Sequence, residues 1–151
     1  MKLAVLNPRG RDPEQAFPDA AGAPDDQVHP PLNYHGFAAC TGGTFYRKDE
    51  AIPKEQKEVL VLIRQDLKAT RQAMLELRRA GKTVAIAWKE AGAFQVASQL
   101  GKAANLRLFE EICQRADGAI ATTPDLVPIF TACGVRYTEF IPTPYPVEDP
   151  R

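Results

Sequence analysis

The sequence lacks an excess of charge of either sign. Nineteen Lys and Arg residues balance nineteen Asp and Glu residues in a chain of 151, so the formal net charge is zero. Proteins that bind nucleic acid or an anionic membrane surface through their charge carry a basic excess. The composition therefore disfavours a nucleic acid or another polyanion as the partner.

Long hydrophobic runs are also missing. A membrane helix needs about 20 consecutive apolar residues. The apolar runs of this sequence are no longer than the one at 59–63. The segment 1–6 leads directly into Pro8 and Arg9, without the apolar core of a signal peptide. We therefore expect a cytosolic protein with no integral membrane segment.

Cysteine and histidine are scarce. The three cysteines, Cys40, Cys113 and Cys133, are an odd number without CxxC spacing, which predicts reduced thiols rather than a disulfide framework. The two histidines, His29 and His35, precede Cys40, but no compact pair or fourth ligand completes a zinc spacing. The sequence thus predicts no metal site.

Proline, in contrast, is concentrated in two places. Six of the thirteen prolines lie between Pro8 and Pro31, a segment without sustained periodicity. Because proline lacks the backbone N–H that helices and central strands need, we expect a long loop or flap there. The tail from Pro142 to Pro150 is predicted to be a stiff exit linker.

Apolar strand patterns alternate with amphipathic helix patterns over the rest of the chain. Uninterrupted apolar runs such as 59–63 indicate strands covered on both faces, as in a parallel sheet. The predicted fold is α/β, with a doubly wound, mainly parallel, Rossmann-like sheet and flanking helices. Strands are expected at 2–6, 59–63, 83–88, 118–121 and 137–141, with a short strand or hairpin within 37–46.

The helices have recognisable ends. Asp66 is predicted to cap a helix that runs to about Ala80 and stops at Gly81, with Leu67, Thr70, Met74 and Leu77 on its buried face. Helices are also expected from Gly92 to Leu100 and around 108–116. A further helix starts with Thr123 as its N-cap and Pro124 as its first residue, and ends at Gly134.

Ligands of open parallel sheets bind beyond the carboxyl ends of the strands, so the loops there supply the candidate contacts. For each such residue an ordinary loop role is the more common alternative. Of the two histidines, His35 is the candidate general base. The candidate substrate-binding residues are Asn7, Arg9, Gly10, Arg64, Lys89, Glu90, Thr122 and Thr123.

Three of these loops have a specific competing interpretation. The start of the helix at Thr122-Thr123-Pro124 offers backbone amides to a phosphate or carboxylate, but capping explains the same residues. Lys89 and Glu90 favour either acid–base chemistry or a solvated ion pair. The glycines of 41–44 are not part of a P-loop or a GxGxxG motif, and a bend in a strand explains them.

One part of the chain resembles a known family. The stretch 116–126, ADGAIATTPDL, followed by 140–146, FIPTPYP, is similar to the second part of the N-terminal domain of GT-B glycosyltransferases. The similarity covers 59–146, about three-fifths of the chain, and the first strand with Asn7-Pro8-Arg9 is consistent with it. The segment between them departs from the family's glycine-rich loop and long first helix.

This resemblance implies a function and a set of partners. Residues 1–146 would form the acceptor-side domain, and 147–151 would begin the linker to a second, donor-binding domain or subunit. The enzyme would transfer a sugar from a nucleotide-sugar donor to an acceptor, without a metal or other cofactor, and the present half alone would be inactive. The alternative is a stand-alone, non-catalytic α/β module that binds a nucleotide or phosphate, or a purely structural subunit.

Overall fold

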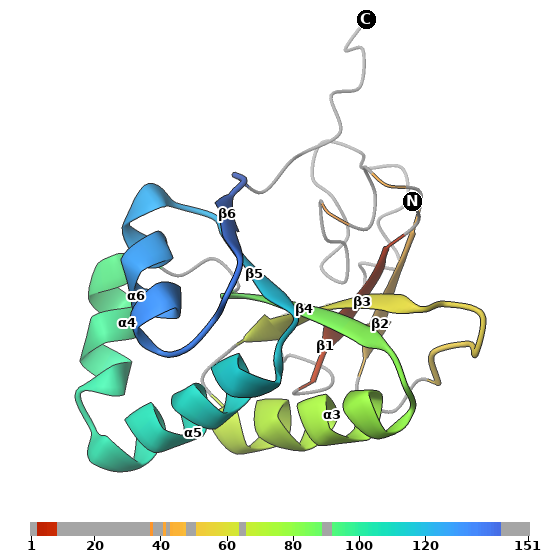
Figure 1. The fold of residues 1–151 in the computed structure, drawn as a ribbon, viewed down its shortest axis with the longest axis horizontal. Coiled ribbons are helices and arrows are strands. Elements are labelled where there is room, and N and C mark those ends of the chain that lie inside the picture. Colours follow the sequence, from red (N-terminus) through yellow and green to blue (C-terminus); the bar gives the residue numbers. More distant parts are fainter. Residues whose placement is uncertain are drawn as a thin grey trace, which may run out of the picture.

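The computed structural model describes residues 3–8, 37, 41, 43–47, 51–63, 66–88 and 92–142. These residues form a six-stranded sheet in the order β2-β1-β3-β4-β5-β6, and every neighbouring pair of strands is parallel (Figure 1). The chain adds β2 on one side of β1 and all later strands on the other. This reversal confirms the predicted doubly wound α/β fold.

The strands lie close to their predicted positions. The segment within 37–46, expected to be a strand or a hairpin, contributes β2, which pairs in parallel with β1 and so is not part of a hairpin. The bounds are β1 Ala4–Asn7, β2 Thr44–Arg47, β3 Glu58–Ile63, β4 Thr83–Trp88, β5 Gly118–Ala121 and β6 Thr138–Phe140.

The helices follow the predicted order. They are α3 Leu67–Arg79, α4 Ala93–Leu100, α5 Ala103–Arg115, the 3₁₀ turn η2 Pro124–Leu126 and α6 Val127–Ala132. Asp66 caps α3 as expected, because its Oδ1 accepts from Ala69 N at 3.0 Å. Gly81, with φ of 78°, follows the helix in the left-handed conformation that glycine tolerates best.

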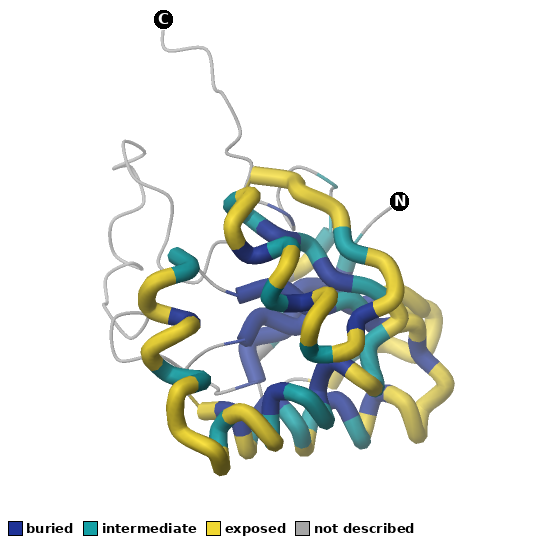
Figure 2. Tube along the Cα trace, turned by 60° about the vertical axis from the view of Figure 1, so that its left-hand side comes forward, coloured by how far each residue is buried: buried dark blue, intermediate teal, exposed yellow. Residues whose placement is uncertain are grey.

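All of these helices pack on one face of the sheet. Alternate strand residues such as Val61 and Ile86 share a single buried cluster with Met74, Val96 and Phe109 of α3, α4 and α5. In Figure 2 the strands form a dark-blue centre, whereas the helices show buried residues on the side facing it. Trp88, Phe109 and Phe130 form a row of ring contacts, with centroids 5.4 and 5.8 Å apart.

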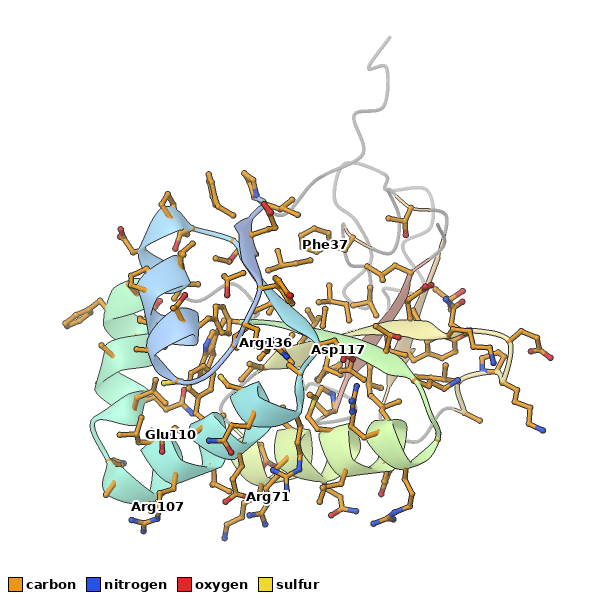
Figure 3. All side chains as sticks on the ribbon, in the orientation of Figure 1. Phe37, Arg71, Arg107, Glu110, Asp117 and Arg136 are labelled. Atoms are coloured by element: carbon orange, nitrogen blue, oxygen red, sulfur yellow. The ribbon has the colours of Figure 1, made fainter. Side chains whose placement is uncertain are left out.

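The opposite face of the sheet has a second, smaller core. Val5, Leu60, Leu62 and Ala87 are buried there. Phe37 joins this cluster and lies on the side away from α3 and α5 (Figure 3). Burial on both faces explains why β3 is an uninterrupted apolar run.

Two segments of the sequence analysis fall largely outside the described residues. They are the proline-rich segment 8–31, of which Pro8 is described, and the tail beyond Pro142. Cys40 is also outside, whereas Cys113 and Cys133 are free thiols, as predicted for these two. Among the described residues no helix is long and apolar enough to cross a membrane; the longest, α3 and α5, have 13 residues each.

Gly43 allows close contact between β1 and β2. A Cβ atom at this position would lie 1.9 Å from the Leu3 carbonyl oxygen. Thr41 supports the same contact, since its hydroxyl accepts from Leu3 N at 3.1 Å and donates to Phe37 O at 2.8 Å. Close approach of two backbones therefore explains the glycine of this segment.

We predict that Gly43→Ala destabilises the protein by about 2 kcal/mol or more, because either β2 shifts or the alanine overlaps the Leu3 backbone. Urea unfolding monitored by circular dichroism measures the change. Gly101→Ala is the matched control, since its added Cβ would make only ordinary contacts, at 3.4 Å and beyond. Equal stability of both variants would contradict the close-contact role of Gly43.

A second prediction concerns pH. Burial of the Cys113 thiol on α5 raises its pKa well above the ordinary value, so the folded protein keeps it protonated while the unfolded chain ionises above pH 8.5. Stability is therefore fully present below pH 8 and falls as the pH rises through the unfolded pKa. We expect wild type to lose about 1 kcal/mol more than Cys113→Ala between pH 7 and pH 9.5 in urea unfolding. An equal change in the free energy of unfolding with pH in the two proteins would refute the raised pKa of Cys113.

Candidate functional site

The carboxyl ends of the six strands meet at one edge of the sheet, because all strands run in the same direction. Of the sequence-predicted contacts, Asn7, Thr122 and Thr123 lie in the described part of this edge. The others fall outside the described residues: Arg9, Gly10, His35, Arg64, Lys89 and Glu90. The candidate site is therefore built from the ends of β1, β4 and β5.

The sequence predicted that Asn7 belongs to the turn after the first strand, but Asn7 is the last residue of β1. It is buried, with 0% exposure. Side-chain alternation along β1 places it on the same face as Val5, away from the helices. A fully buried amide side chain at the end of a central strand is uncommon, so its burial distinguishes Asn7 from an ordinary loop residue.

Thr123 lies where β5 leads into η2, in an extended conformation with φ of −133° and ψ of 152°. Thr123 occupies the N-cap position and Pro124 the first helical position, as predicted, but the Thr123 hydroxyl makes no capping hydrogen bond. The reason is local: the helix starts as a 3₁₀ turn, in which Leu126 N donates to the Thr123 carbonyl at 3.2 Å. Pro124 has no N–H to offer. The predicted N-cap position of Thr123 is therefore confirmed, whereas a side-chain capping bond is absent.

Two buried polar atoms near this edge have no hydrogen-bond partner in the part of the chain that the structure describes. They are Oγ1 of Thr123 and Nε1 of Trp88, whose residue is the last of β4 and only 2% exposed. A buried donor or acceptor without a partner costs about 1–3 kcal/mol. Such groups are normally satisfied by an ordered water or by a ligand. Both atoms are therefore candidate hydrogen-bonding groups of the site.

The start of α4 borders the same edge. Gly92 is its N-cap, and the Gln95 side chain folds back so that its Oε1 accepts from Gly92 N at 2.7 Å. This contact satisfies one of the backbone donors that a helix start leaves without intrahelical partners. Capping therefore accounts for Gln95 without a ligand.

The described candidates do not converge on one point. Three strand-to-strand steps separate β1 from β5, since β3 and β4 lie between them. At roughly 4.8 Å per step, Asn7 is about 14 Å from the end of β5. Thr122 and Thr123 can meet the same small group, whereas Asn7 can join them only on a ligand that spans the edge.

The pairing of β5 with β6 brings two distant segments together. Ala121 pairs with Phe140, and Ile141 N donates to Ala121 O at 2.9 Å. The segment that starts at Thr122 and the segment that starts at Pro142 therefore leave the sheet side by side. The periodicity of the sequence predicts both strands but not their pairing.

In comparisons with known proteins, no protein family, curated protein or solved structure matches the chain. Within the described ranges, no three His, Cys, Asp or Glu side chains lie close enough to hold a metal ion.

We predict that Thr123→Val leaves the unliganded protein equally stable or stabilises it by up to about 1 kcal/mol, because it removes a hydroxyl without a partner. A capping hydroxyl would give the opposite sign, a loss of about 1 kcal/mol. Thermal unfolding of wild type and Thr123→Val measures the difference. Asp66→Ala is the control for a true cap, and we expect it to lose stability.

Proposed function

We propose that residues 1–146 form the acceptor-side domain of a GT-B type glycosyltransferase and that 147–151 begin the connection to a donor-binding domain or subunit. The doubly wound parallel sheet supports this proposal, since such a domain presents the carboxyl ends of its strands to an interdomain cleft. The enzyme would transfer a sugar from a nucleotide-sugar donor to an acceptor.

The observation that carries the proposal is the adjacency of the two segments that resemble the family. The first, 116–126, contains β5 and the whole of η2, and the second, 140–146, begins at the end of β6. Their pairing lets 122–125 contribute to one wall of a cleft while the neighbouring strand leads out at Pro142. A connection between two domains would leave the sheet beside the acceptor site.

In this proposal the carboxyl edge holds the acceptor. Thr122 and Thr123 are half-buried and supply hydroxyls that can orient an acceptor hydroxyl. Asn7, Arg9, Gly10, Arg64, Lys89 and Glu90 complete the proposed contacts, and His35 is the proposed general base. The donor's phosphates would be held by the second domain, so this half alone would not catalyse transfer.

A specific observation favours a second candidate, a stand-alone module that binds a nucleotide or phosphate. The Thr123 hydroxyl, which has no partner among the described residues, lies two residues after the parallel strand β5, in the region where ligands bind in α/β folds. In that case the chain needs no second domain to hold its ligand.

Calorimetric titration with a panel of nucleotide sugars separates these functions. The glycosyltransferase proposal predicts a Kd weaker than about 1 mM for the chain alone, the upper end of common KM values. It predicts at least tenfold tighter binding when a separately encoded donor-binding domain is added. Submillimolar binding by the chain alone would refute the split-cleft proposal and support the stand-alone module.

The position of such binding is tested by a matched pair of variants. In the stand-alone module, Thr123→Val should weaken nucleotide binding at least threefold, because the hydroxyl would contact the ligand. Thr83→Val removes an exposed hydroxyl at the opposite edge of the sheet and should leave the affinity unchanged. Equal effects of both variants would exclude binding at the carboxyl edge.

A further inference from the structure

A groove runs along α3 on the helix-covered face of the sheet, separate from the edge at β5. The described segment 51–57 before β3 is not helical, and its residues Ala51 and Ile52 line the groove beside α3. The cavity volume is about 300 Å³. The lining residues of this α3 groove include Leu6 and Pro8 at the end of β1, Ile52, and the α3 stripe of Ala69, Ala73 and Glu76.

The volume of the α3 groove suits a small molecule. This volume lies at the lower end of the range for small-molecule sites.

The floor of the α3 groove is apolar. Leu6 and Leu77 are buried members of the helix-face core, and Ile52 and Ala73 pack against it. Ala69 and Ala73 occupy successive turns of α3, and their short side chains leave room above this floor. An aliphatic chain is the chemistry that such a floor accepts, because its burial removes apolar surface from water.

The polar groups of the α3 groove carry opposite charges. Glu76 accepts from Gln72 Nε2 at 3.0 Å and, among the described residues, forms no ion pair. Lys82 is 8% exposed, and its Nζ donates to the carbonyls of Pro53 at 3.1 Å and Gln56 at 2.7 Å. One carboxylate and one ammonium offset each other, so a ligand with a net charge of either sign gains little.

From these observations we propose that the α3 groove binds a small, uncharged aliphatic alcohol. Its hydrocarbon chain lies over Leu6, Ala69 and Ala73. Its hydroxyl, which both donates and accepts hydrogen bonds, bonds to the polar side chains of the groove, Glu76 and Lys82. This site is independent of sugar transfer at the carboxyl edge.

The test is calorimetric titration of the full chain with 1-octanol, n-octylamine and octanoate, three probes of nearly equal size. We expect a Kd for 1-octanol of about 1 mM or tighter and at least threefold weaker binding of both ions. Weaker binding of 1-octanol than about 1 mM would overturn the proposal. Equal binding of either ion would overturn its uncharged character.

Two variants locate the binding. Ala73→Leu fills the middle of the groove and Ala80→Leu, at an exposed lining position, narrows one end, so that the second remains informative if the first does not fold. Each should weaken 1-octanol binding, by at least tenfold and threefold respectively. Ala104→Leu, on the exposed surface of α5, should not change it. Unchanged binding in a folded Ala73→Leu or Ala80→Leu protein would overturn the location.

Discussion

The burial of β3 on both faces is the constraint on which the rest of the structure depends. Its residues Val59–Ile63 have exposures of 0–1%, so each peptide group must bond to a neighbouring strand and each side chain must be covered. Parallel pairing with β1 and β4 meets the first requirement. The helices above and the Phe37 cluster below meet the second. In a chain built around such a strand, the loops lie at two opposite edges of the sheet.

Sorting of the loops places different polar groups at the two edges of the sheet. At the amino edge, Asp117 bonds to Arg78 and accepts from Val84 N at 2.8 Å, whereas the buried Oγ1 of Thr138, the first residue of β6, has no partner among the described residues. Lys82 is held there by two carbonyls. At the carboxyl edge, Thr123 and Trp88 carry buried polar atoms with no partner among the described residues. Polar groups that the fold leaves unsatisfied are more informative about ligands than polar groups that merely lie in loops.

The strands and helices were predictable from the sequence because their signals are local. Val59–Ile63 is a continuous apolar run, and Asp66 and Gly81 bound α3 as cap and stop residues do. The arrangement of the candidate site was not predictable, because it depends on strand order. The sequence cannot indicate that β2 and β3 flank β1, and so it cannot indicate that the ends of β1 and β5 are separated by three strand spacings, about 14 Å.

Thr123 also shows that a motif can predict the position of a residue correctly without predicting the interaction of its side chain. A threonine before a proline is a strong N-cap signal, and a helix does begin there. The first turn, however, is a 3₁₀ turn closed by the Thr123 carbonyl, so the backbone performs the capping and releases the hydroxyl. The α3 groove is lined in part by Ala51 and Ile52 of the described segment 51–57, which is not helical. Both candidate ligand sites thus lie beside a part of the chain that is not regular α-helix.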